Sequence, residues 1–230
     1  MLKAVIISGK SAARISGIHR LPPSRHFVPH KDSLASIRAI FKHLRNPQLF
    51  AIYSVGFNIL FVFTGVFTYI TFYLAAAPFH LGSVALGFMF LVNLFGAVVT
   101  PIAGRWIDRF GYRITVVCAN AVSCTGVLLT LWPNLWIVLV GLSLCSAGVF
   151  VCNSAATSYL GIAAGHSRSS AAGLYVASYY IGGSVGAVLP GFLWTMGGWP
   201  ACVALIVVIQ FLTTSIALAF WQSKLAKTVD

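Results

Sequence analysis

Acidic side chains that could take part in chemistry are scarce in this chain. Its only acids are Asp32, Asp108 and Asp230, and it has no Glu. Asp108 stands in the segment 104–113 together with three arginines. Such a mixed cluster can form ion pairs, and these are stronger beside an apolar medium than in bulk water. The segment is therefore the first candidate functional site.

These residue types and spacings fit few enzyme mechanisms. Catalysis by paired carboxylates needs two acids close together. The five cysteines show no CxxC spacing, and neither His80 nor His166 has a carboxylate nearby in the sequence. No phosphate-binding loop or Ser-His-Asp pattern occurs. We therefore expect a protein that is not an enzyme and that holds no metal and no cofactor.

The composition indicates an all-α integral membrane protein. Of the 230 residues 59% are hydrophobic and only 8% are charged. A soluble domain has about 25% charged residues, and disorder requires low hydrophobicity. Membrane β-barrels alternate polar and apolar residues, whereas the apolar runs here are unbroken. The lipid bilayer is the first expected partner.

Three long segments without any Lys, Arg, Asp or Glu determine the expected topology. They are 46–104, 114–167 and 169–223. Each is long enough for two crossings of about 20 residues, and each has Pro or Gly turn signals near its middle. We expect six transmembrane helices in three hairpins, as the domain 48–222. The expected helices are 48–76, 84–104, 114–132, 135–161, 171–195 and 200–222.

The charged loops then all fall on one side of the membrane. By the positive-inside rule this side is cytoplasmic. Both termini are thus expected in the cytoplasm of a cell with an inner (plasma) membrane, with a short tail at 223–230.

A basic extension precedes the first expected helix. Nine of the 15 basic residues lie in 1–45, so residues 1–47 are predicted to be a cytoplasmic extension. Leu34, Ile37, Phe41 and Leu44 recur at helical spacing, which suits a helix on an anionic inner leaflet. A solvated basic linker is the alternative. No nucleic-acid partner is expected, because no aromatic interleaving accompanies the charges.

The segment 104–113 has a specific spacing, G-x-x-x-D-R-x-G-x-R. Its members are Gly104, Asp108, Arg109, Gly111 and Arg113. The first glycine would allow close backbone approach, and the second would permit a tight turn. Asp108 could also meet a helix N-terminus. A charged turn that only directs topology is the alternative interpretation.

This pattern resembles the signature loop of the major facilitator superfamily, which joins helices two and three of each six-helix half. The resemblance implies one half of a twelve-helix fold. The basic stretch before it is similar to the family's central loop. The chain therefore resembles the C-terminal half of a drug- or sugar-efflux type transporter, over roughly residues 21–222.

The resemblance implies efflux of a small organic solute, with this chain supplying part of the cavity. In the family the solute lies between two halves, so a separate N-terminal half or a second copy is an expected partner. Asp108 would then engage helix five of that other half. The alternative is a membrane scaffold or a truncated, inactive fragment that does not transport.

Cavity residues must be uncharged, because no expected helix contains a charge. By the family's arrangement, the first, second, fourth and fifth expected helices face the cavity. The candidates are Asn58, Asn93, Asn153, Tyr175 and Tyr179. The alternative for each is interhelical hydrogen bonding, which is favoured for Asn120 and Gln210.

The fifth expected helix also has a possible hinge. Gly182 and Gly186 form a small-xxx-small pair that lets helices approach closely, and Pro190 should kink the helix. The sequence leaves two interpretations of these residues: a gating element, or close static packing of the helix against its neighbours.

Overall fold

The computed structural model describes residues 46–164 and 168–221, and in these ranges all regular structure is helical. The helices are α3 (Pro47–Ala75), α4 (Ser83–Met89), α5 (Val92–Leu129), α6 (Leu135–Ala163) and α7 (Arg168–Phe220). The expected extension 1–47, apart from its last two residues, and the tail 223–230 lie outside the described residues, as do residues 165–167.

Asparagine caps begin two of the long helices. The Asn46 side chain accepts a hydrogen bond from the Gln48 amide at 3.0 Å, and Pro47 occupies the first helical position. Asn134 accepts one from the Trp136 amide at the start of α6. Both arrangements satisfy amide groups that a helix leaves unpaired at its N-terminus.

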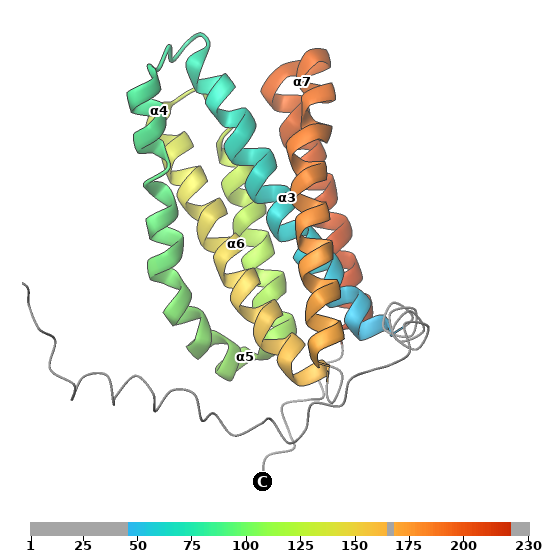
Figure 1. The fold of residues 1–230 in the computed structure, drawn as a ribbon. Coiled ribbons are helices and arrows are strands. Elements are labelled where there is room, and N and C mark those ends of the chain that lie inside the picture. The colour runs from blue at the N-terminus through green and yellow to red at the C-terminus, as the bar shows by residue number, and fades with distance from the viewer. Residues whose placement is uncertain (1–45, 165–167, 222–230) are drawn as a thin grey trace, which may run out of the picture. The chain divides into compact units, whose positions relative to one another are not determined.

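Two of the helices contain a glycine break at which the chain turns back. In α5 the break is Gly111, with φ 79° and ψ 164°. In α7 it is Gly197 and Gly198, and Gly198 has φ 62°. A positive φ is cheap only for glycine. Figure 1 shows both ribbons folding back there, so each helix has a first and a second arm.

The arms are 92–110 and 112–129 in α5, and 168–196 and 199–220 in α7. Cys202 in the second arm of α7 donates its thiol hydrogen to the carbonyl oxygen of Pro190 in the first. At the same end, the Trp199 ring nitrogen bonds to the Thr130 hydroxyl at 3.1 Å. The reversal of α7 is thereby joined to the end of α5.

Four helical stretches in the described ranges are long and apolar enough to cross a membrane. The expected spans 48–76 and 135–161 match α3 and α6 to within two residues. The expected span 84–104 is divided into α4 and α5. The division arises because Phe90 and Leu91 make tight i→i−3 backbone hydrogen bonds.

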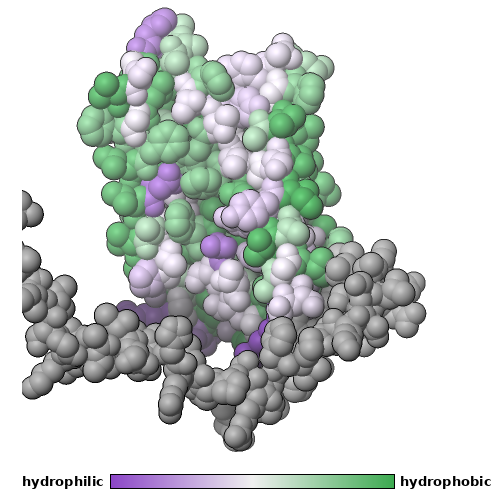
Figure 2. Space-filling view, viewed as in Figure 1, coloured by the Kyte–Doolittle hydropathy of each residue, from purple (hydrophilic) through white to green (hydrophobic). Residues whose placement is uncertain are grey.

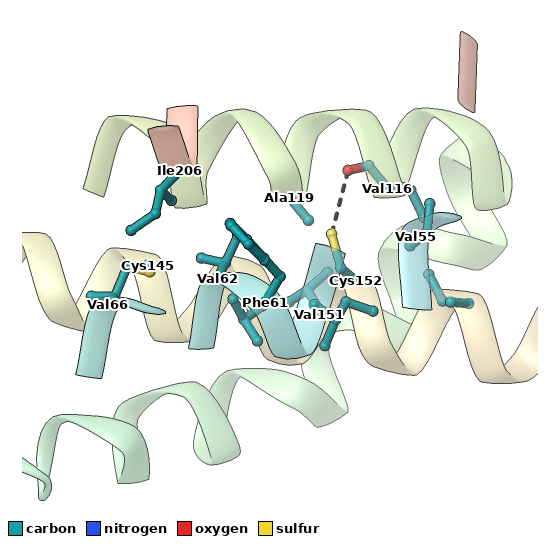
Figure 3. Close-up of a cluster of buried hydrophobic side chains, with 14 of the residues drawn as sticks. Val55, Phe61, Val62, Val66, Val116, Ala119, Cys145, Val151, Cys152 and Ile206 are labelled. Atoms are coloured by element: carbon teal, nitrogen blue, oxygen red, sulfur yellow. Dashed lines mark hydrogen bonds between the residues drawn. The ribbon is translucent and has the colours of Figure 1, made fainter. Parts of the chain in front are cut away.

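Packing joins α3 chiefly to α7, and α5 chiefly to α6, while α3 also contacts α6. Figure 3 shows Phe61 and Val62 of α3 between the second arm of α5 and α6. The Cys152 thiol of α6 donates to the Val116 carbonyl across the same core. Buried cysteine acts here as a small apolar side chain.

Candidate functional site

Gly111 forms the turn of the signature segment, as its position in the sequence predicted. Its φ of 79° is the left-handed conformation that glycine adopts without strain. Gly104 behaves differently. A Cβ placed on Gly104 would have no heavy atom within 4 Å, so the expected close backbone approach does not occur among the described residues. A glycine pattern alone could not distinguish these two uses.

Two of the three arginines of this segment, Arg109 and Arg113, have partners other than Asp108. Arg113 donates from Nη2 to the Leu218 carbonyl oxygen at 2.5 Å, close to the end of α7. Carbonyls in the last turn of a helix lack intrahelical donors and carry partial negative charge. The Arg109 guanidinium carbon lies 5.4 Å from the centroid of the Phe110 ring. Asp108 is exposed on the first arm of α5.

Three of the five cavity candidates lie together. The Tyr175 hydroxyl donates to the Asn153 side-chain oxygen at 3.2 Å, linking α7 to α6. The rings of Tyr175 and Tyr179 are stacked with centroids 6.3 Å apart. Tyr180 adds an exposed ring edge-on to Tyr179. Asn153, Tyr175 and Tyr179 form what we call the amide–tyrosine cluster.

Gly56 of α3 makes room for this cluster. A Cβ there would be 2.7 Å from Cε2 of Tyr175, so only glycine lets the ring lie against α3. Tyr175 is thus buried, whereas Asn153 and Tyr179 are half-buried. The signal for this contact in the sequence is one of the two glycines of an apolar helix, which the pattern of polar residues does not single out.

Asn58 lies in a different, fully buried place. Its side-chain nitrogen donates to the Asn120 oxygen at 3.0 Å, and Asn120 in turn donates to the Gln210 backbone carbonyl at 2.9 Å. Gln210 donates to the Ser123 hydroxyl at 2.8 Å. We call these four residues the amide network. It joins α3 to the second arms of α5 and α7, which is the interhelical role predicted for Asn120 and Gln210.

Asn93 also bonds between helices. Its side-chain oxygen accepts from the Ser146 hydroxyl at 2.9 Å, which links α5 to α6. Gly96, one turn further on, faces the same serine. Neither Asn58 nor Asn93 contacts the amide–tyrosine cluster through a hydrogen bond in the described chain. The structure therefore divides the five candidates into one cluster and two separate interhelical contacts.

The expected hinge residues lie against the backbone of α3. A Cβ on Gly182 would collide with the Phe57 carbonyl oxygen, and one on Gly186 would lie 2.5 Å from the Phe61 carbonyl oxygen. The backbone of α7 stays helical through Pro190, and its break comes at Gly197 and Gly198. These contacts are those of close packing.

A further open groove lies on α3 beside α4. Its cavity volume is about 340 Å³. Its walls are phenylalanines and threonines, namely Phe63, Thr64, Phe67, Thr68, Thr71, Phe72 and Phe90. On the face seen in Figure 2, pale and lilac side chains run between green apolar flanks.

Long apolar helices joined by buried amides, with an arginine-rich turn at one end, define a multi-pass helical membrane protein. The sequence profile of the Major Facilitator Superfamily matches residues 76–228. The chain belongs to the Major Facilitator Superfamily.

Several curated proteins are similar over most of the chain. An uncharacterized MFS-type transporter of Bacillus subtilis, YybF, is 32% identical over 204 residues, which are 88% of this chain and 49% of that protein. The inner membrane transport protein YnfM of Escherichia coli is 34% identical over 196 residues, 84% and 47% of the two chains. The chain spans about half the length of the curated relatives it matches.

Proposed function

We propose that this chain is the C-terminal half of an efflux-type transporter for a small organic solute. The observation that carries the proposal is the amide–tyrosine cluster, half-exposed on a bundle of this family. An amide, two stacked rings and no charge suit an uncharged or aromatic solute. The groove of phenylalanines and threonines beside α4 supports the same solute class.

A half-length chain needs a second half to enclose a solute. The chain covers 49% and 47% of two relatives named as transporters, which supports a partner that is a separate N-terminal half or a second copy. Asp108 is exposed and free to meet such a partner. The alternative function is a membrane scaffold or inactive fragment, in which the cluster serves packing alone.

The proposed topology has six crossings with both termini in the cytoplasm. The two arms of α5 and of α7, with α3 and α6, supply six helical stretches. The arginine-rich turn at Gly111 then lies on the cytoplasmic side, as the positive-inside rule requires. Alkaline phosphatase fused after 80, 134 or 198 should be active, and fused after 109 it should be inactive.

The transport proposal is tested in cells that co-express this chain with an N-terminal half. The assay follows efflux of preloaded Nile red, an uncharged aromatic dye. We expect Asn153→Ala and Tyr179→Ala each to lower the efflux rate about tenfold, because each removes a contact from the half-exposed side of the cluster. Thr125→Ala is the matched control, since Thr125 is exposed and its hydroxyl donates to the Ala121 carbonyl oxygen of its own helix.

Normal efflux by Thr125→Ala, together with slowed efflux by Asn153→Ala and Tyr179→Ala, would support the proposal. Equal efflux by all variants would contradict the cluster as a solute site. Absence of Nile red efflux by the unmodified pair, repeated with a second uncharged aromatic dye, would favour the scaffold.

A further inference from the structure

An apolar groove lies between the two arms of α5 and α6, apart from the cluster proposed to bind solute. Its cavity volume is about 120 Å³. Trp106 and Thr115 line the end next to the Gly111 turn, and Val99 and Val122 line the far end. The groove thus runs from the arginine-rich turn toward the middle of the helices.

Water is a poor occupant of this groove. The hydroxyl in its lining belongs to Thr115, and this hydroxyl already donates to the Gly111 carbonyl oxygen at 2.9 Å. Apart from the Cys118 thiol, the remaining lining side chains are hydrocarbon or indole. A buried water needs two to four polar partners. An acyl chain has no polar group that needs a partner, so it matches this lining of hydrocarbon and indole.

The mouth of the groove is basic and aromatic. Arg109 follows Trp106 by three residues, so it lies on the same face of the helix, whereas Asp108 lies about 200° round from Trp106 and about 60° from Arg105. The Arg109 guanidinium lies over the Phe110 ring. The rings of Phe110 and Trp106 lie edge-on to each other, with their centroids 6.5 Å apart. Arg105 is exposed one residue before Trp106.

We propose that this groove binds an anionic phospholipid, with one acyl chain between the arms of α5 and the phosphate on Arg109 and Arg105. Charge complementarity selects the occupant: the segment 104–113 at the mouth carries three arginines and one aspartate, and anionic lipids give the cytoplasmic leaflet its negative surface potential. Aromatic rings at the level of the headgroups are typical of membrane interfaces. The inference stands independently of transport.

Native mass spectrometry of the full chain in detergent tests the site. The protein is titrated with phosphatidylglycerol and with phosphatidylcholine of the same acyl chains. We expect tighter binding of phosphatidylglycerol. Arg109→Gln should weaken phosphatidylglycerol binding about fivefold, and the double variant with Arg105→Gln should weaken it about 25-fold. Each arginine is expected to contribute as a basic residue near a lipid surface does.

Two matched variants separate a site from general attraction. Arg168→Gln removes an exposed arginine from the start of α7 and should leave the preference unchanged. Arg109→Lys keeps the charge and should retain most of the preference. Equal binding of both lipids by the unmodified chain would overturn the proposal. An equal loss from Arg168→Gln and Arg109→Gln would also overturn it.

The acyl-chain part has its own test. Cys118→Phe fills the groove from an exposed lining position. It should weaken the binding of both lipids by the same factor and leave the thermal unfolding temperature unchanged. Glycerol phosphate, which has no acyl chain, should not displace phosphatidylglycerol at equal concentration. Displacement by glycerol phosphate would instead indicate a phosphate site and would refute the acyl-chain slot.

Discussion

The helix α3 and the stretch formed by α4 with the first arm of α5 are equally apolar, yet they are used in opposite ways. In the most apolar 18-residue window of α3, 67% of the residues are buried inside the bundle, against 11% in the most apolar window of the stretch 83–129. High hydropathy in a membrane protein therefore indicates that a segment is surrounded by lipid or by protein, but it does not indicate which of the two surrounds it.

Small and polar residues separate the two regions. Gly56 and Gly65 of α3 admit Tyr175 and the backbone of α7, and Asn58 joins the amide network. The first arm of α5 packs through a narrower face that includes Gly96 and Ala103. Van der Waals contact and hydrogen bonds, rather than hydrophobicity, hold helices together in lipid.

The largest expected effect comes from filling the contact between α7 and α3. Gly182→Leu places a side chain where the Phe57 carbonyl lies, so it should destabilise the bundle by about 3 kcal/mol or more. The matched control is Gly173→Leu on the same helix, where a Cβ meets nothing within 4 Å. Thermal unfolding in detergent measures both. Equal stability of the two variants would contradict the observed packing of α7 on α3.

An intermediate effect is expected from a pair of isoleucines in the two regions. Ile59 of α3 is 2% exposed and Ile102 of α5 is 48% exposed. Ile59→Ala leaves a cavity and should cost about 2 kcal/mol, whereas Ile102→Ala should cost less than about 0.5 kcal/mol. The same unfolding assay compares them. A large cost at Ile102 would reveal that a further protein surface covers this arm.

The smallest expected effect is at the amide network. Asn120→Ala removes the partner of Asn58 and should cost about 1 kcal/mol, because interhelical hydrogen bonds in membranes are individually weak. Thr125→Ala, exposed on the same arm, should change stability by less than about 0.5 kcal/mol. Chemical unfolding in mixed micelles measures the difference. A loss of several kcal/mol would show that the network acts as one cooperative unit.

Patterns of charge predicted more of this structure than patterns of polar residues did. The uncharged runs and their Pro or Gly turns placed the ends of α3 and α6 within two residues, and Gly111 was correctly predicted as a turn. These features depend on lipid solvation and on local backbone preference, which a single sequence carries.

The side-chain contacts depended on long-range packing. Asn58 and Asn153 are the same residue type in two strongly apolar helices, yet one is buried in the amide network and the other is half-exposed beside Tyr175. Their difference follows from which helix lies opposite each, and that choice is made by close contacts such as Gly56 with Tyr175. Helical periodicity in one segment does not contain this information.

The bond between Asn58 and Asn120 has a consequence for synthesis at the ribosome. Asn58 enters the membrane 62 residues ahead of Asn120. At about 5–20 residues per second, this delay lasts roughly 3–12 s. During that interval the Asn58 amide lies in or beside lipid without its final partner, which is costly. Newly made α3 is therefore expected to stay beside the insertion machinery, or with another temporary neighbour, until the second arm of α5 follows.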